Sequence, residues 1–485
     1  MSSVTLSLVS HTNAGKTTLA RTLLGVDIGE VRDAPHVTEL ASMHELIRSP
    51  AGDVLRLWDT PGFGDSARLA RRLRAQGNPL GWFLSAVWDR WRDRAFWASQ
   101  QALRHVRDES DVLLYLVNAA EWPGAAGYVE PEMDLLAWVG KPVLVLLNQM
   151  GPPRAAADEA VDIATWRAHL ARWPGVRAVL PLDAFARCWV HELTLMRAVH
   201  TALGGASGGP RAEAMARLAD TWQARRVATF EASMAALAAS LARTAGAREL
   251  VLGDNGWAER LRRLGAALGQ AAPADADPAA AAQSRLAATL EAEVRADTAQ
   301  LLALHGLNGS ASGEILSRVA HQFTRHERLP EGRAALLGGA LAGAITGLKA
   351  DILSGGLTLG GGLLAGALIG ALGAAGVARG INVVRGTGQS WVAWRDDALD
   401  GAAQAALLRY LAVAHFGRGR GDWSPGEAPP HWPAAVAQAL AQRRDALTAV
   451  WAGRSQRLDA ADDSAAMAAA LQPLLAQGAR EVLGT

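Results

Sequence analysis

The feature that most constrains the fold is an apolar segment near the N-terminus that leads directly into a loop containing glycine and lysine. Residues 4–9 form a short, largely apolar run, and Ser-His-Thr-Asn-Ala-Gly-Lys-Thr-Thr follows at positions 10–18. Leu19 and Leu23 come next at a spacing of four, which predicts a helix. An order of strand, loop and helix, with lysine and threonine at the helix start, is typical of phosphate-binding loops.

Each residue type in this loop suits one part of a phosphate site. Backbone N–H groups converge on phosphate oxygens, a lysine neutralises the β- and γ-phosphates, and a hydroxyl binds magnesium. We therefore predict Lys16 as the catalytic phosphate lysine and Thr17 as a magnesium ligand. The pattern has glycine where this chain has Ser10, so the loop alone does not decide the matter. The residues predicted to contact nucleotide are Asn13, Ala14, Gly15, Lys16, Thr17 and Thr18.

A second anchor is the sequence Asp-Thr-Pro-Gly at positions 59–62. An aspartate that follows a strand can reach the magnesium shell, and a glycine amide can sense the γ-phosphate. We therefore assign Asp59 to the metal site and Gly62 to the catalytic group. Thr38 lies where a switch loop would offer its hydroxyl to magnesium and its amide to the γ-phosphate, although threonine is also common at strand starts.

Further short apolar runs predict a doubly wound α/β sheet. The first two runs flank a turn with proline and glycine, which indicates an antiparallel edge hairpin. The others are separated by helix-length stretches, as strands of a mostly parallel sheet are. The predicted strands after the first are residues 38–47, 54–58, 112–117, 143–147 and 176–180.

The motif that would select the base departs from the usual Asn-Lys-x-Asp. This chain has Asn148 followed by Gln-Met-Gly at positions 149–151, so the aspartate that accepts hydrogen bonds from guanine is missing. Losing a charged acceptor for two donors costs about 2 to 4 kcal/mol, which leaves loose GTP binding or ATP binding open. Asp183 could replace this carboxylate, although a helix N-cap is the favoured explanation for it.

The C-terminal part changes to a helical pattern. Met215, Leu218 and Trp222 begin a series with the spacing of a helical bundle. Residues 271–284 are rich in alanine, proline and aspartate and are predicted to be a linker. The predicted organisation is a nucleotide-binding domain at 1–205, with a tryptophan-rich helical insertion near 67–107, then a helical region at 206–332, a hydrophobic hairpin at 333–380 and a C-terminal helical region at 381–485.

The hairpin prediction rests on composition. Apart from arginines at its ends, segment 333–380 has only Lys349 and Asp351 as charged residues, and its glycines recur four apart. Such ridges let helices pack closely in a membrane, and two helices of about 20 residues would fit. The arginines would face the cytoplasm, with Trp391 and Trp394 near the membrane interface. The alternative for this segment is a soluble pair of helices buried in protein. For the separate tryptophan-rich insertion near 67–107, the alternatives are that its tryptophans pack internally or that they form a membrane or partner surface.

Composition excludes some classes of function. The formal charge of +1 gives no basic field for gripping nucleic acid, so no nucleic-acid partner is expected. Cys188 is the single cysteine, which excludes an internal disulfide and fits the cytoplasm. The N-terminal residues run directly into the phosphate loop, so we expect no cleavable signal peptide.

The loop sequence Asn-Ala-Gly-Lys-Thr-Thr-Leu at 13–19 resembles that of Era/TrmE-like P-loop GTPases, and the resemblance covers about the first 200 residues. The whole chain is similar to a proteobacterial family that joins such a domain to a C-terminal domain of unknown function with a Gly-Leu-Lys-Ala-Asp stretch, here Gly347–Asp351. The resemblance implies a Ras-like fold, GTP/GDP and Mg²⁺. In TrmE-like members the loop asparagine can coordinate K⁺, which makes Asn13 a candidate potassium ligand.

The same resemblance bears on activity. Ras-like switches have glutamine after Asp-x-x-Gly, whereas this chain has Phe63, which implies slow hydrolysis completed by a protein partner, self-association or a monovalent cation. The sequence thus favours a slow GTPase switch at the cytoplasmic face of the inner membrane. The alternatives are a soluble nucleotide-binding scaffold with little turnover and relaxed base specificity, and, less favoured, a factor for ribosome or RNA assembly. No general base is visible in the sequence.

Overall fold

The structure is a computed structural model of the 485-residue chain. It describes residues 2–11, 14–24, 42–60, 62–63, 66–75, 94–150, 156–182, 189–250, 278–307, 391–415, 431–454 and 464–484. The predicted site residues Asn13, Thr38 and Asp183 and the predicted hairpin at 333–380 lie outside these ranges.

The chain divides into two compact units. The first contains the described residues of Met1–Ala228 and Ala414–Pro429, and the second contains those of Thr229–Val413 and Pro430–Thr485. One helix, α8 (Pro210–Gly246), begins in the first unit and ends in the second.

The first unit is built on a six-stranded sheet with the order β2-β3-β1-β4-β5-β6. Neighbouring strands are parallel except β2 and β3, which form the predicted antiparallel hairpin at the sheet edge. The predicted doubly wound α/β fold is therefore confirmed. The strands are β1 (Ser3–Ser10), β2 (Ser42–Arg48), β3 (Val54–Asp59), β4 (Val112–Asn118), β5 (Val143–Asn148) and β6 (Val176–Pro181).

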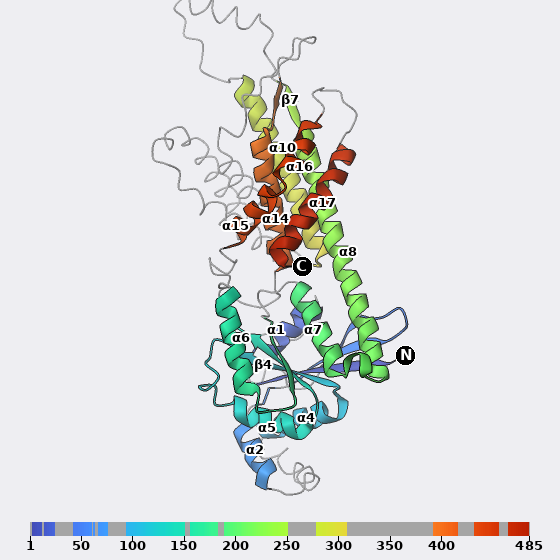
Figure 1. Ribbon diagram of the computed structural model, residues 1–485, viewed down its shortest axis with the longest axis vertical. Helices are drawn as coiled ribbons and strands as arrows, with labels where there is room; N and C mark the ends of the chain where they lie inside the picture. Colours follow the sequence, from blue (N-terminus) through green and yellow to red (C-terminus); the bar gives the residue numbers. More distant parts are fainter. Residues whose placement is uncertain are drawn as a thin grey trace, which may run out of the picture. The chain divides into compact units, whose positions relative to one another are not determined.

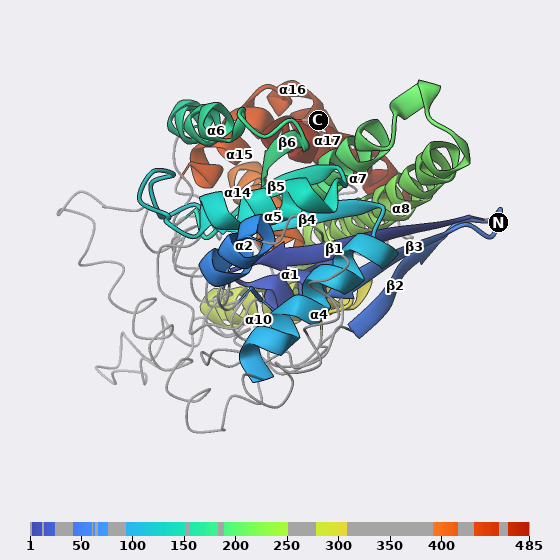
Figure 2. The same cartoon turned by 90° about the horizontal axis from the view of Figure 1, so that it is seen from below.

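Helices cover both faces of this sheet, and α4 and α5 cross the near face in Figure 2. One core lies between the sheet and α1, α7 and the first part of α8, and it includes Leu19 and Met196. The other core lies beneath α2, α4, α5 and α6, and it includes Leu136 and Trp166. These helices are α1 (Lys16–Leu24), α2 (Ser66–Ala75), α4 (Arg94–Glu109), α5 (Val129–Val139), α6 (Ala156–Leu170) and α7 (Trp189–Ala202), and a short 3-10 helix, η1 (Gly205–Ser207), precedes α8.

The central strands explain why the apolar runs in the sequence predicted this sheet. Every residue of β5 is buried, and β4 is buried from Val112 to Val117. A strand covered by helices on both faces needs apolar residues at every position, so it appears in the sequence as a continuous run.

The tryptophan-rich segment 67–107 is described only at its two ends. α2 begins just before it and α4 ends just after it, and Leu103 and Val106 of α4 are fully buried in the sheet core. This end of the segment therefore packs internally. Trp82, Trp88 and Trp91 lie outside the described residues.

The second unit is mostly helical, as predicted, with α14 at its centre (Figure 1). Tyr410 of α14 packs edge-on against Phe230 of α8, with ring centroids 5.7 Å apart. A Cβ added at Gly478 of α17 would lie 3.4 Å from Leu407 of α14, so these two helices approach closely. The helices that follow α8 are α10 (Pro278–Leu304), α14 (Asp396–Ala414), α15 (Trp432–Ala441), α16 (Arg444–Ala452) and α17 (Ser464–Leu483).

A two-stranded antiparallel ribbon adds β structure that the sequence did not predict in this region. It joins β7 (Arg248–Leu250) to β8 (Trp391–Ala393), two segments far apart in the chain. The Arg248 guanidinium lies 4.9 Å from the ring centre of Trp391 on the opposite strand. Burial lowers the pKa of Arg248, and the nearby charge of Arg454 lowers it further.

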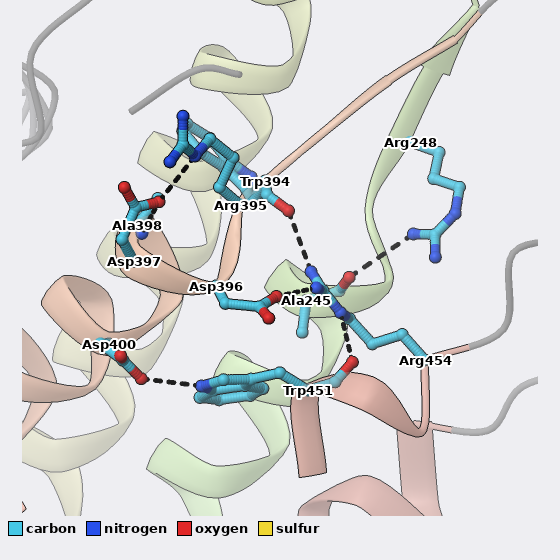
Figure 3. A network of polar contacts seen from close by, with 10 residues as sticks. All are labelled: Ala245, Arg248, Trp394, Arg395, Asp396, Asp397, Ala398, Asp400, Trp451 and Arg454. Atoms are coloured by element: carbon cyan, nitrogen blue, oxygen red, sulfur yellow. Dashed lines mark hydrogen bonds and ion pairs between the residues drawn. The ribbon is translucent and has the colours of Figure 1, made fainter. Parts of the chain in front are cut away.

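Arg454 ties this part of the second unit together (Figure 3). It donates to the carbonyl oxygens of Trp394, at 2.9 Å, and Trp451, at 2.7 Å, and it pairs with Asp396. The Trp451 indole donates in turn to Asp400 at 2.8 Å. One guanidinium thus caps the end of α16 and holds the start of α14.

Two sequence predictions for this region are wrong. The linker predicted at 271–284 is wrong for its second half, which is helical from Pro278, because proline is well tolerated in the first turn of a helix and alanine favours the helix interior. Residues 271–277 lie outside the described residues. Trp391 and Trp394 are each only 4% exposed and belong to the packed second unit, not to a membrane interface. Among the described helices, none is both long and apolar enough to cross a membrane.

Candidate phosphate and magnesium site

Gly15, which immediately precedes α1, has a backbone conformation that suits the glycine of a phosphate loop. Gly15 has a φ of +89°, a conformation that L side chains rarely adopt. A Cβ at Gly15 would also lie only 2.7 Å from Nδ2 of Asn148. The carbonyl of Gly15 accepts from the Leu19 amide at 2.9 Å, so the loop continues directly into α1.

Lys16 is buried, and its ammonium group lies against the start of the loop. Nζ donates to Ser10 Oγ at 3.0 Å and approaches the His11 carbonyl at 3.5 Å. The Ser10 hydroxyl donates to the same carbonyl at 2.6 Å. Burial lowers the pKa of Lys16, while Asp59 and Glu132 oppose this shift. The serine at the position of the usual glycine therefore helps to orient the lysine.

Thr17 and Asp59 meet at the end of β3. The Thr17 hydroxyl donates to Asp59 Oδ2 at 2.6 Å, and Asp59 is 2% exposed. Its other oxygen, Oδ1, is buried and has no hydrogen-bond partner among the residues that the structure describes. Burial raises the pKa of Asp59, and the Thr17 hydrogen bond and Lys16 act against this shift. A hydroxyl and an unsatisfied carboxylate oxygen are the hard ligands that Mg²⁺ prefers, so these residues fit the ion.

The segment that follows Asp59 is held next to the phosphate loop. The Thr60 hydroxyl donates to the carbonyl of Leu8 at 2.5 Å, and the Phe63 amide donates to the carbonyl of Ser10 at 3.0 Å. Phe63 is 1% exposed and packs into a sheet core. The side chain at the position of the usual glutamine is therefore directed into the protein. Gly62 lies immediately before it and is half-buried.

Asn148 connects the end of β5 to the phosphate loop. It is fully buried, and its Nδ2 donates to the carbonyl of Ala14 at 2.9 Å. Gln149 comes next with a φ of +57°, the one positive φ at a non-glycine position within the described ranges. A strained conformation of this kind costs of order 1 kcal/mol and is enriched at functional sites. The first two residues of the motif that would select the base, Asn148 and Gln149, thus have a defined conformation although the usual aspartate is missing.

The structure also places a group of side chains that the sequence analysis missed. His11 Nδ1 lies 2.9 Å from Oε1 of Glu132 on α5, and the Tyr115 hydroxyl donates to Oε2 of the same carboxylate at 2.9 Å. The His11 ring stacks on Tyr128, with centroids 4.7 Å apart. Burial raises the pKa of Tyr128 to about 12. The sequence held one indication of this group: Glu132 lies four positions before Leu136, which places an acidic residue on the apolar face of a helix.

The predicted site residues divide into two groups. Those that lie together at the carboxyl ends of β1, β3 and β5 are Ala14, Gly15, Lys16, Thr17, Thr18, Asp59, Gly62 and Asn148. Asn13, Thr38 and Asp183 lie outside the described part, so their predicted roles stay predictions. Among the described residues, no group of three or more His, Cys, Asp or Glu side chains could hold a metal ion. A magnesium site that is completed by phosphate oxygens does not require such a group.

A comparison with protein families decides what kind of domain carries this site. The family described as 50S ribosome-binding GTPase matches residues 5–149, which span the strand, the phosphate loop, Asp59 and Asn148. Residues 5–149 are a P-loop GTPase domain of this family. GTP, GDP and Mg²⁺ are the ligands that the family implies. The GTPase domain accounts for the first part of the chain, and no curated protein matches the sequence.

Several solved structures match part of the chain at low identity. Era from Aquifex aeolicus bound to GDP and AlF₄⁻ has 19% identity over 41% of this chain, with a TM-score of 0.31. Era in complex with MgGDPNP and a piece of 16S ribosomal RNA has 18% identity over the same share and a TM-score of 0.30. The matches span 56% of each Era chain. Toc33 from Arabidopsis thaliana has 17% identity over 39% of this chain and 73% of its own, with a TM-score of 0.24.

Proposed function

We propose that this protein is a slow GTPase switch, in which the GTPase domain binds GTP with Mg²⁺ and hydrolyses it to GDP and phosphate. The observation that supports this most directly is the convergence of Lys16, Thr17 and Asp59. Lys16 is buried beside the loop, and the Thr17 hydroxyl contacts an aspartate with one unsatisfied oxygen. A site with a buried cation and hard oxygen ligands suits a triphosphate and a divalent ion.

The proposed chemistry assigns a task to each described residue. Water attacks the γ-phosphorus, the bond to the bridging β-phosphate oxygen breaks, and the water proton leaves with phosphate or to solvent. The Gly15 backbone surrounds the phosphates, and Lys16 stabilises the charge that passes to the leaving group. A bound magnesium ion would neutralise phosphate oxygens, held by Thr17 and Asp59 and by Thr38 if the sequence prediction holds.

Slow turnover follows from the position of Phe63. Its side chain is buried in a sheet core and has no polar group with which to orient water. The loss of an orienting residue leaves positioning and electrostatics as the sources of catalysis. A protein partner, self-association or potassium at Asn13 would then complete the site.

The proposed output of the switch is the helical region, because α8 begins in the first unit and continues to Gly246. Within the first unit, Arg226 of α8 makes two hydrogen bonds to Glu192 of α7, at 2.7 and 3.0 Å. The Trp222 indole donates to the same carboxylate at 2.8 Å, and Glu192 is 2% exposed. A bidentate pair between an arginine and a buried carboxylate holds a helix in one orientation.

Membrane association remains part of the proposal on sequence grounds alone, through residues 333–380. The direct test is co-sedimentation of the full chain with vesicles of phosphatidylethanolamine and phosphatidylglycerol, compared with a chain lacking 333–380. Sedimentation that depends on this segment supports attachment to the inner membrane. If both chains stay in the supernatant, the alternative of a nucleotide-dependent scaffold is favoured.

The experiment that tests nucleotide binding is titration of fluorescent GTP and ATP analogues, with and without Mg²⁺, using Lys16→Ala as the control. Magnesium-dependent binding of GTP that the variant loses supports the proposal. Equal or tighter ATP binding would show that the altered Asn148 motif does not select guanine. Binding without turnover would favour the scaffold.

Nucleic acid is tested separately, because the family description refers to ribosome binding. The balanced charge of the chain predicts no salt-dependent affinity for RNA. Ribosomal RNA binding that weakens steeply between low and moderate salt would contradict this expectation and would favour a role in ribosome assembly.

A further inference from the structure

A fully buried carboxylate lies behind the phosphate loop, where it serves no part of the chemistry assigned so far. Glu132 of α5 has no exposed surface, and it contacts His11 and Tyr115, each at 2.9 Å. Burying an ionised carboxylate is costly unless it is paired and hydrogen-bonded. A negative group close to a triphosphate site also opposes ligand charge. Its presence therefore needs an explanation beyond packing.

The contacts of Glu132 show which part of the loop it controls. Burial raises the pKa of Glu132, and its contacts with His11 and Tyr115 and the charge of Lys16 oppose this shift. The contact between Glu132 Oε1 and His11 Nδ1 fixes the orientation of the imidazole ring, and an ionised carboxylate there would accept a proton donated from Nδ1. Tyr128 limits the ring from the other direction by stacking, with 22° between the two planes. His11 is the residue that connects β1 to the phosphate loop, so fixing its side chain also fixes its backbone.

Two parts of the phosphate site meet at the Ser10–His11 backbone. The His11 carbonyl accepts from Ser10 Oγ and lies 3.5 Å from Nζ of Lys16. The Ser10 carbonyl accepts from the Phe63 amide, and His11 and Phe63 form a parallel β-bridge. A displacement of the His11 backbone, which lies between these two carbonyls, would therefore disturb the contacts of both the phosphate lysine and Phe63.

We infer that Glu132 is a positioning residue that acts through His11 to hold the phosphate lysine and the Gly62–Phe63 segment in register for the γ-phosphate. This inference rests on the proposed function and deepens it. Lys16 serves the β- and γ-phosphates and Gly62 senses the γ-phosphate. Loss of the contact should therefore weaken GTP binding and turnover more than GDP binding. A purely structural role would lower stability without changing the ratio of the two affinities.

The test measures GDP affinity, affinity for a non-hydrolysable GTP analogue and turnover for the full-length chain and five variants. His11→Ala and Glu132→Ala should each lower turnover and GTP-analogue affinity by about tenfold, a typical effect of misplacing a reacting group. GDP affinity should change much less. His11→Asn retains a side-chain N–H near the position of Nδ1 and should therefore keep most of the wild-type turnover and GTP-analogue affinity. Glu132→Gln should give values between those of the wild-type chain and Glu132→Ala.

Tyr115→Phe is the matched control, because it removes a hydrogen bond to the same buried carboxylate without touching the loop. It should lower stability and leave the ratio of GTP to GDP affinity unchanged. His11→Ala alters a residue that is about one-third exposed, so it remains informative if Glu132→Ala fails to fold.

The outcomes separate the inference from the proposed function. If the wild-type chain binds and hydrolyses GTP while His11→Ala behaves like Tyr115→Phe, the positioning role is wrong and the GTPase proposal stands. If the wild-type chain binds neither GTP nor GDP, the positioning role and the GTPase proposal are both wrong. Failure of His11→Asn to restore the ratio would also overturn the role assigned to the Glu132 contact.

Discussion

Arg217 on α8 donates from Nε to Asp53 Oδ2 at 2.7 Å and so ties the first part of this helix to the turn between β2 and β3. The other oxygen of Asp53 accepts from the Ser2 amide at 2.9 Å. The β2–β3 hairpin ends at Asp59, so the helix and the candidate magnesium ligand are attached to the same pair of strands. Movement of this hairpin would therefore act directly on the first part of α8 through the contact between Asp53 and Arg217.

This ion pair predicts a specific response to acid. Its hydrogen bonds, chiefly that from Arg217, lower the pKa of Asp53 to about 2. A carboxylate with a depressed folded-state pKa adds stability above its unfolded value near 3.9, and this contribution is lost as the pH falls toward 2. Arg217→Gln should therefore move the acid-unfolding midpoint to higher pH, as measured by circular dichroism.

The control for this prediction is Arg197→Gln on α7. Arg197 donates to the neutral side chain of Gln223 at 3.5 Å, so its loss should leave the acid midpoint unchanged. Equal acid profiles for Arg217→Gln and the wild-type chain would show that the Asp53 contact contributes nothing to stability.

Gly15→Ala tests whether the loop geometry is required. The substitution places a side chain at a φ of +89° and brings its Cβ to 2.7 Å from Asn148. We expect a loss of about 1–3 kcal/mol in unfolding free energy from backbone strain. Nucleotide affinity should fall by about tenfold or more, since a displaced loop amide no longer faces the phosphates.

Gly140→Ala separates strain from displacement of the loop. Gly140 also has a positive φ, of +72°, but a Cβ there would meet nothing within 4 Å. This variant should lose similar stability and keep wild-type nucleotide affinity. If both variants weaken nucleotide binding equally, the local contact with Asn148 is not the reason for glycine at position 15.

Potassium dependence is a separate prediction, based on the TrmE-like asparagine of the loop. If Asn13 coordinates potassium, hydrolysis should be faster in KCl than in NaCl at equal ionic strength, and Asn13→Ala should remove the difference. The measurement is phosphate release under both salts. Equal rates in the wild-type chain would exclude a role for potassium and leave a protein partner or self-association to complete the site.

The sheet and the phosphate loop were predictable from sequence because their residues follow local rules. β5 is buried along its whole length, and Gly15 occupies a conformation that glycine tolerates best. The contacts of Glu132 were not predictable, because they depend on how α5 is seated on β4 and beside the loop. An acidic residue in a helix is usually exposed, and only the fold shows that this one is buried.

Long-range pairing also explains the errors in the second unit. Trp391 and Trp394 follow the glycine-rich segment and suggested a membrane interface, but β8 pairs with β7 about 140 positions earlier in the chain, a contact that no local pattern encodes. Residues 271–284 suggested a linker because they are rich in alanine, proline and aspartate, and they include Pro278. At the first turn of α10 the same residue starts a helix instead.

The buried ion pair of the second unit supports the last prediction. Arg409 of α14 donates to Asp297 of α10 at 2.8 Å, and both side chains are 3% exposed. Burial raises the pKa of Asp297, while Arg409 opposes the shift. Arg409→Met leaves an unpaired buried carboxylate and should lower the unfolding free energy by about 3–5 kcal/mol. Urea unfolding measures the free energy of unfolding of each variant. The matched control is Arg395→Met, which breaks the exposed pair between Arg395 and Asp397 and should change the unfolding free energy by at most about 1 kcal/mol. Adding Asp297→Leu to Arg409→Met should recover part of the loss, because no buried charge then remains without a partner. If the double variant is less stable than Arg409→Met alone, the loss comes from altered packing between α10 and α14 and not from the uncompensated charge.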